Sequence, residues 1–197
     1  MDPINEKEIV ERLARGETAA FREFVDSYKK KIYGLAFEMT RNHADAEDVS
    51  QAVFIKVFKS IGTFKTDANL KSWLYRIVVN ASIDHLRKRP FYPVEKTSDM
   101  PGRLFDDSLP RLADGSADPG RETESRELKK KIHDALDRIS EREKAVFLLR
   151  HDHDLNLKEI ADVLGLTLGA VKSYLFRSIK KLQKELGVVA APLEPGG

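Results

Sequence analysis

The sequence contains no cysteine and no long uninterrupted run of apolar residues. Without cysteine there is no disulfide, no thiolate metal site, no iron–sulfur cluster and no cysteine nucleophile. No stretch reaches the roughly 18 apolar residues that indicate a membrane-spanning helix. The N-terminus is acidic and amphipathic, unlike a signal peptide. These absences predict a soluble cytoplasmic protein without membrane insertion.

Motifs of catalysis are missing as well. The sequence has no glycine-rich phosphate loop and no nucleophile elbow. Its densest group of potential metal ligands is His151-Asp152-His153-Asp154. Alternating neighbours on a regular backbone point apart, and no H-E-x-x-H motif completes a site. We therefore expect a solvated turn at 151–154, and we expect no cofactor and no enzymatic activity.

The 197 residues are 41% hydrophobic and 34% charged, which is enough apolar material for a core under a densely charged surface. The net charge of +2 averages over segments of opposite sign. Residues 1–89 carry 16 Lys/Arg against 13 Asp/Glu, and 126–186 carry 14 against 10. Residues 90–125 carry only 4 against 8. Two basic blocks thus flank an acidic connector.

The connector 90–125 holds five of the eight prolines and three of the eleven glycines, without a sustained apolar period. Such a stretch predicts a linker, and a linker of this length favours two domains over one. The tail 187–197 is expected to be disordered. The rest predicts an all-α fold, because apolar residues recur at helical spacing and hairpin turns are rare. We expect helices at roughly 5–15, 17–40, 44–61, 68–88, 124–138, 141–151, 156–164 and 168–186.

The C-terminal block has the spacing of a helix-turn-helix. Asn156 followed by Glu159 predicts a capping box at the start of helix 156–164. Gly165 should end that helix, and Thr167 is the expected N-cap of the next.

Helix 168–186 has one apolar stripe and one basic face. The stripe comprises Val171, Leu175, Ile179 and Leu182. The opposite face comprises Ser173, Phe176, Arg177 and Lys180, with Lys172 at its edge. From Thr167 to Lys184 there are five Lys/Arg and no Asp/Glu, which favours entry into a DNA major groove. The alternative is a merely solvated face, but such a face normally mixes signs and seldom exposes phenylalanine.

Helix 44–61 places Val49, Val53, Val57 and Ile61 toward the core of the N-terminal block. A second apolar pair, Phe54 and Phe58, is displaced from this stripe and accompanied by polar Asp48 and Gln51. This arrangement suits either a protein partner or a helix surrounded by core, and the pattern does not separate the two.

Aromatic and basic residues are interleaved after that helix. Phe64, Trp73 and Tyr75 alternate with Lys65, Lys71 and Arg76, and Asn80 follows one turn later. Rings that stack on unpaired bases and cations that bind phosphates are typical of single-strand binding. Core packing of the rings is an equally good interpretation of this pattern.

Together the two blocks resemble a bacterial RNA polymerase sigma factor of the extracytoplasmic-function (ECF) group in the sigma-70 family. Residues 17–89 resemble region 2, 126–186 resemble region 4, and the connector lies where that group has a linker. The motifs that carry the resemblance are Asp45-Ala-Glu-Asp-Val-Ser-Gln51-Ala-Val-Phe54, Phe64 through Asn80, and Leu168 through Arg177.

The resemblance implies a protein that docks on core RNA polymerase, selects promoters and promotes duplex melting. It implies contact with the clamp helices of the largest polymerase subunit by Asp45, Asp48, Gln51, Phe54 and Phe58. For the single-stranded −10 element it implies Phe64, Lys65, Asn69, Lys71, Trp73, Tyr75, Arg76 and Asn80. For the double-stranded −35 element it implies Thr167, Lys172, Ser173, Phe176, Arg177 and Lys180. The flap region of the polymerase and an anti-sigma factor are further implied partners.

Three positions depart from the family pattern: Lys172 where many members have arginine, Tyr174 where a basic residue is frequent, and Ile179 in the core stripe. Lysine lacks the planar fork that arginine presents to guanine, which leaves the −35 preference open. The rival interpretation is a conventional dimeric helix-turn-helix regulator, which would need a large self-complementary apolar face. No such face is obvious in residues 1–89.

Overall fold

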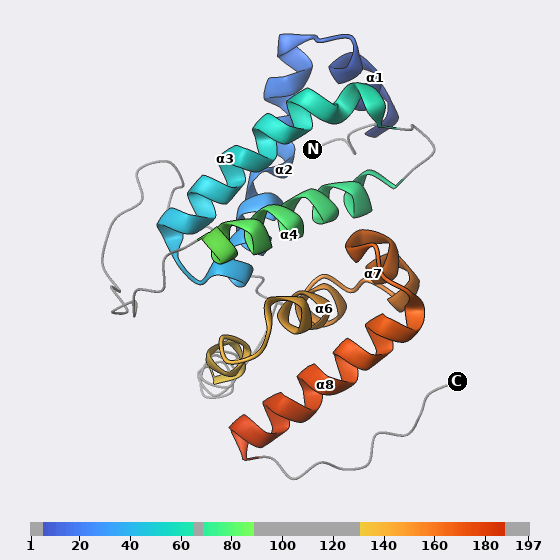
Figure 1. Cartoon of the computed structure of the whole chain (residues 1–197). Helices are drawn as coiled ribbons and strands as arrows, with labels where there is room; N and C mark the ends of the chain where they lie inside the picture. The colour runs from blue at the N-terminus through green and yellow to red at the C-terminus, as the bar shows by residue number, and fades with distance from the viewer. Residues whose placement is uncertain (1–5, 65–68, 89–130, 188–197) are drawn as a thin grey trace, which may run out of the picture. The chain divides into compact units, whose positions relative to one another are not determined.

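The computed structural model describes residues 6–64, 69–88 and 131–187, and within these ranges all regular structure is helical. The chain separates into two compact units, as the sequence predicts. The N-terminal unit contains α1 to α4, and the C-terminal unit contains α6, α8 and most of α7 (Figure 1). The predicted linker 90–125 and all but the first residue of the tail 187–197 lie outside the described residues.

The N-terminal unit is a helical bundle in which α2, α3 and α4 pack against one another. Its elements are α1 (Glu6–Ala14), α2 (Thr18–Thr40), α3 (His43–Ser60), the short 3₁₀ helix η1 (Ile61–Thr63) and α4 (Leu70–Lys88). The four α-helices confirm the predicted ones to within about two residues, whereas η1 was not predicted. Helix α1 packs on α2 and on η1.

The predicted core stripe of α3 is confirmed, because Val49, Val53, Val57 and Ile61 are all buried. Two serines, Ser50 and Ser82, are buried among these helices. Their hydroxyls donate to the carbonyl oxygens of Ala46 and Val78, so neither is left unpaired. Small satisfied side chains at these positions allow α3 and α4 to pack closely with their neighbours.

The C-terminal unit contains α6 (Glu141–His151), α7 (Leu157–Leu164) and α8 (Leu168–Leu186), and residues 131–136 are also helical. The cap predictions for the helix-turn-helix are confirmed. Asn156 and Glu159 form the capping box of α7, and Gly165 ends that helix at a φ of 62°. The Thr167 hydroxyl accepts from the Ala170 N–H, so it caps α8 as expected. Residues 124–130 of the first predicted helix in this block lie outside the described residues.

The apolar stripe of α8 is partly confirmed. Val171 and Leu182 are buried, but Leu175 and Ile179 are only half-buried. Ser178 is fully buried between them, which the sequence pattern did not predict. Its hydroxyl donates to the Leu175 carbonyl at 2.8 Å, so a polar residue occupies the stripe without an unpaired group.

A buried carboxylate, Glu143, fastens α6 to α8. Its Oε2 accepts from Lys181 Nζ at 2.7 Å and from the Ser140 N–H at 3.2 Å, which closes a capping box on α6. Its Oε1 lies 3.5 Å from Arg177 Nε. Burial alone would raise the pKa of Glu143, but the hydrogen bonds from Lys181 and Ser140 outweigh it and hold that pKa below its ordinary 4.5.

We expect Glu143→Gln to lower the free energy of unfolding at pH 7 by about 1–3 kcal/mol, because Lys181 and Arg177 lose their shared anion. A carboxylate whose pKa is depressed by folding stabilises above its unfolded pKa and loses that contribution as the pH falls through the folded value. The difference between variant and wild type should therefore shrink as the pH falls below 4.5. Denaturant unfolding followed by circular dichroism at pH 7 and pH 3.5 measures it.

Glu141→Gln is the matched control, since Glu141 lies in the same first turn of α6 without sharing the buried position of Glu143. It should change the free energy of unfolding by no more than about 0.5 kcal/mol. A Glu143→Gln variant that is destabilised equally at both pH values would contradict an ionic role for Glu143.

Candidate protein and nucleic-acid interfaces

The outward face of α3 is acidic and polar at its start and apolar at its end. Asp48 and Gln51 are exposed. Ile55 and Phe58 are exposed as well, with 56% and 58% of their surface accessible to solvent. These four positions follow one another at spacings of three and four residues, so they form one continuous strip, here called the α3 strip. An exposed apolar segment bordered by polar groups is typical of a protein-binding surface.

The α3 strip differs in composition from the predicted apolar pair Phe54 and Phe58. Phe54 is half-buried, and its ring lies edge-on to that of Phe24 in α2, with centroids 6.5 Å apart. Phe58 also touches α2, through the ring of Phe21 at 5.2 Å, yet it remains exposed. Ile55 was not predicted to belong to this surface. Its position 200° around the helix from buried Val53 is the sequence signal that indicates an outward side chain.

Asp45 does not belong to the α3 strip. Its side chain is largely buried, and its Oδ1 lies 3.0 Å from His85 Nε2 in α4. Its N–H donates to the side chain of Asn42, the N-cap of α3. The structure therefore places Asp45 where it fixes the start of α3 against α4.

Two aromatic rings meet where η1 leads toward α4. The centroids of Phe64 and Trp73 are 5.1 Å apart, and both residues are half-buried. Asn69 precedes α4, and its Oδ1 accepts from the Ser72 N–H at 3.1 Å, so its side chain caps the helix. Lys65 lies outside the described residues. The Phe64–Trp73 pair presents partly exposed π-faces, which is what base stacking requires.

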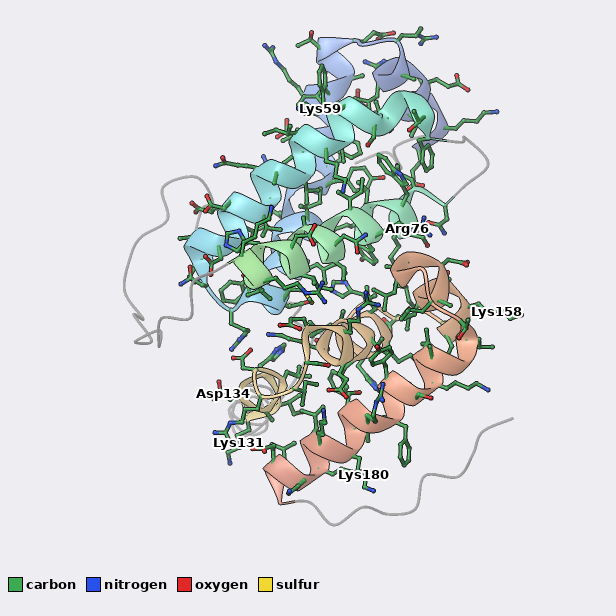
Figure 2. The ribbon with its side chains drawn as sticks, in the orientation of Figure 1. Lys59, Arg76, Lys131, Asp134, Lys158 and Lys180 are labelled. Atoms are coloured by element: carbon green, nitrogen blue, oxygen red, sulfur yellow. The ribbon has the colours of Figure 1, made fainter. Side chains whose placement is uncertain are left out.

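Tyr75 lies on the other side of α4 from Trp73 and is only 7% exposed. Burial is the main cause that raises the pKa of Tyr75 to about 12, and the nearby charge of Glu38 is the second cause. The ammonium of Lys71 lies 5.6 Å from the centre of its ring. The structure therefore brings Phe64 and Trp73 together at the surface but places Tyr75 in the core. Arg76 and Asn80 are exposed one turn apart on α4 (Arg76 is labelled in Figure 2).

The outward face of α8 matches the basic face that the sequence predicts. Five residues on this face are exposed: Lys172, Ser173, Phe176, Arg177 and Lys180 (Lys180 is labelled in Figure 2). The exposed fraction of Phe176 is 59%. The Ser173 hydroxyl donates to the Gly169 carbonyl at 2.9 Å and keeps its acceptor lone pairs. Leu168, which is 38% exposed at the start of the helix, was not predicted.

The charges on α8 fall into two groups. Arg177 and Lys181 face the buried carboxylate of Glu143, on the flank toward α6. Within the described part of the chain, Lys172, Lys180 and Lys184 form no ion pair with a carboxylate. The outer face therefore keeps a positive charge that polyanionic backbones attract.

The predicted turn after α6 contains no metal-binding arrangement. No group of three potential ligands from His, Cys, Asp and Glu gathers anywhere in the described ranges. The ring of His151 packs on that of Phe147, with centroids 4.5 Å apart, and burial lowers the pKa of His151. Among the described helices, none is both long and apolar enough to traverse a lipid bilayer.

Sequence comparison links both units to known proteins. Residues 24–90 match Sigma-70 region 2, and residues 129–182 match Sigma-70, region 4. The ECF RNA polymerase sigma factor SigW of Bacillus subtilis is 31% identical over 182 residues, which cover 91% of this chain and 96% of the relative. The RNA polymerase sigma-H factor of Pseudomonas aeruginosa is 30% identical, with coverage of 92% and 93%.

Solved structures share the fold. CnrH, solved in complex with the cytosolic domain of CnrY, is 20% identical with a TM-score of 0.65, covering 94% of this chain and 99% of that one. The sigma factor RpoE of Bartonella quintana, solved with the anti-sigma factor NepR, is 22% identical with a TM-score of 0.62, covering 86% and 98%.

Region 2 followed by region 4 in one chain defines a sigma-70-type initiation factor. The chain belongs to the ECF family of RNA polymerase sigma factors. The match of both units to sigma regions supports this assignment over a conventional dimeric helix-turn-helix regulator.

The geometry of α3 separates surface from core at neighbouring positions. Ile55→Ala should change the free energy of unfolding by no more than about 0.5 kcal/mol, because Ile55 is exposed. Val57→Ala should cost about 2 kcal/mol, because it opens a cavity at a fully buried position. Denaturant unfolding of the two single variants measures both values. Equal costs would show that Ile55 is packed and would remove it from the α3 strip.

Proposed function

We propose that this protein is the promoter-specificity subunit of a bacterial RNA polymerase, acting in the cytoplasm and supplying recognition rather than catalysis. The observation that carries the proposal is the chemistry of three outward helix faces in a chain of this family. The α3 strip suits a protein, the start of α4 suits unpaired bases, and the face of α8 suits duplex DNA. Transcription in vitro with core enzyme and a promoter library tests the role directly.

The α3 strip is the proposed contact with the clamp helices of the largest polymerase subunit. Asp48 and Gln51 supply charge and hydrogen bonds, and Ile55 and Phe58 supply apolar area that is exposed in the chain alone. Apolar anchors within a polar surround are the usual source of binding energy in protein interfaces. Asp45 contributes indirectly, by holding α3 through His85. For the C-terminal unit we propose the flap region of the polymerase as the corresponding contact.

The −10 element is proposed to bind as single strand around Phe64, Trp73 and the outward side of α4. Separating a stacked base-pair step costs about 1.4 kcal/mol, so captured bases must return that energy. Stacking on a protein ring contributes about 1–3 kcal/mol per base. Arg76 and Lys71 would bind phosphates, and the Asn80 amide can read a base edge. By family resemblance we also assign Lys65 and Asn69 to this site, and Tyr75 supports α4 from the core.

The −35 element is proposed to bind as duplex against α8. Lys172 and Lys180 carry charge toward phosphates or base edges, and exposed Phe176 can contact a thymine methyl group. Thr167 holds the start of α8 in place through its cap. A helix N-terminus also favours nearby phosphate.

An anti-sigma factor is the remaining proposed partner. The support is that RpoE of Bartonella quintana, a structural relative, was solved with such a protein. The exposed side chains Ile55, Phe58 and Phe176 offer apolar area that a regulatory partner could cover in each unit.

Docking on the polymerase is tested by the double variant Asp48→Lys plus Gln51→Ala. We expect at least a tenfold weaker affinity for core polymerase, because charge and hydrogen bonding are lost at the polar start of the α3 strip. Titration of labelled polymerase, with co-elution in gel filtration, measures it. Asp26→Lys on α2 is a charge-matched control that should bind normally. Undiminished affinity in the double variant would place the docking surface elsewhere.

Melting is tested by Trp73→Ala. We expect about a tenfold loss of open complex at a promoter, because a stacking surface worth about 1–3 kcal/mol is removed. Permanganate reactivity of unpaired thymines reports the open complex, and filter binding reports the closed one. Tyr75→Phe, which keeps the buried ring, should melt DNA normally. The role of Trp73 fails if both variants open the promoter equally well.

A further inference from the structure

Helix α1 packs on η1, the short 3₁₀ helix that leads from α3 to the ring pair of Phe64 and Trp73. They meet at the corner where α1 ends, α2 starts and α3 ends (Figure 1). At this corner the rings of Phe21 in α2 and Phe58 in α3 lie 5.2 Å apart, so the end of α3 is packed against the start of α2. One short element therefore connects α1 with the ring pair.

The position of Phe64 is set by η1. The Phe64 N–H donates to the Ile61 carbonyl at 3.0 Å, and the backbone becomes extended at Phe64, where η1 ends. Ile61 is the buried residue of η1, whereas Gly62 and Thr63 are exposed. A single 3₁₀ turn has few hydrogen bonds of its own and their geometry is poor. The place of η1 therefore depends on what packs against the Ile61 side chain.

The side that α1 turns to the bundle is apolar. Ile9, Val10 and Leu13 are buried, and Glu8 and Glu11 are exposed. A helix of 9 residues is too short to be stable in water on its own, so α1 keeps its conformation through these packing contacts. Leu13 lies in the last turn of α1, which adjoins the start of α2. Leu13 is thus the buried side chain of α1 that lies at the corner with η1.

Polar contacts fix where α1 lies along α2. The Tyr28 hydroxyl donates to Glu6 Oε1 at 3.1 Å, near the start of α1. Near its end, Arg12 Nη1 lies 2.9 Å from Glu23 Oε2. Such exposed pairs contribute little to stability, so the buried apolar side chains supply most of the packing energy of α1. The polar contacts set the position of α1, and its apolar side packs on η1 from that position.

We propose that α1 is a brace for the −10 site, and that Leu13 is a positioning residue that holds the Phe64 ring against Trp73 through η1. Two rings that keep one arrangement before DNA arrives lose less conformational freedom on binding than two rings that move independently. The proposal rests on the proposed function, because it needs the ring pair to bind unpaired bases. It goes further by giving α1, which the proposed function does not use, a role in promoter opening.

The brace is tested first in the full chain without polymerase or DNA. Trp73 is the only tryptophan in the sequence, so its fluorescence reports on the ring pair directly. Leu13→Ala should raise the quenching of Trp73 by acrylamide about twofold, because Phe64 no longer stays packed against the indole. Leu13→Met keeps the side-chain volume and should be quenched like wild type. Circular dichroism confirms folding, and Leu13→Val replaces Leu13→Ala if the larger truncation does not fold.

Leu35→Ala is the matched control for lost stability alone. Leu35 is fully buried and lies about 21 Å along α2 beyond Phe21, away from the corner with η1. The same truncation at this site should lower the midpoint of denaturant unfolding at least as much as Leu13→Ala does. The quenching of Trp73 should nevertheless equal that of wild type. Glu11→Ala, on the exposed side of α1, should change neither the midpoint nor the quenching.

The effect on melting is measured with holoenzyme reconstituted from core polymerase and the full chain. Leu13→Ala should lower the permanganate reactivity of unpaired thymines about threefold, and Phe64→Ala should lower it about tenfold. The affinity for core polymerase should be unchanged in Leu13→Ala, because the α3 strip is intact. Adding Leu13→Ala to Phe64→Ala should cause no further loss, since a positioning residue acts only through the residue that it positions.

The outcomes separate the brace from the proposed function. Unchanged quenching of Trp73 in folded Leu13→Ala, or an equal rise in Leu35→Ala, overturns the brace and leaves the proposed function intact. Additive losses of melting in the double variant also overturn it, because Leu13 would then act independently of Phe64. Normal melting in Phe64→Ala rejects the −10 role of the ring pair, and the inference fails with it.

Discussion

The period of the α-helix is the constraint on which both units depend. With 3.6 residues per turn, a helix can present only one stripe to its core, and the side chains left outside are the ones available for recognition. On α3 the inward residues Val53 and Val57 alternate with outward Ile55 and Phe58 within a single turn and a half. On α8 buried Val171 and Leu182 share the helix with exposed Phe176. Stability and recognition are therefore encoded in the same short segments but at separable positions.

A single carboxylate has an unusual number of roles in the C-terminal unit. Glu143 closes a cap, pairs with Lys181 and faces Arg177. A buried charge is costly unless it is paired and hydrogen-bonded, and this one receives both kinds of compensation. Because its two cations lie one turn apart on α8, the same interaction that joins α6 to α8 also sets the rotation of α8 about its axis. The direction in which the basic face points follows from that rotation.

Helix positions and caps could be predicted because they are local. Asn156, Glu159, Gly165 and Thr167 act within a few residues of themselves, and all four have the roles that their types and spacing indicate. The order of the motifs was likewise sufficient to indicate the family that the comparisons show.

What the sequence could not supply is set by contacts between distant residues. Asp45 meets His85 across 40 positions, and Glu143 meets Lys181 across 38. Neither pairing has a periodic signal. The sequence also could not predict which aromatic residues lie in the core and which at the surface. Trp73 and Tyr75 are each compatible with either place until neighbouring helices fix the outcome. Leu175 and Ile179 were predicted to be buried, but they are only half-buried and Ser178 takes the buried position beside them. Hydropathy does not reveal a buried hydroxyl that is bonded to its own helix.

The water-facing position of Ile55 and Phe58 has a thermodynamic consequence for the chain on its own. Apolar area that stays hydrated after folding does not stabilise the native state. It stabilises the folded protein only when a binding partner covers it. By mass action, any ligand that covers these side chains only in the folded form raises the apparent melting temperature in proportion to the logarithm of its concentration. The thermal stability of this protein thus depends on the partners bound to it as well as on its sequence.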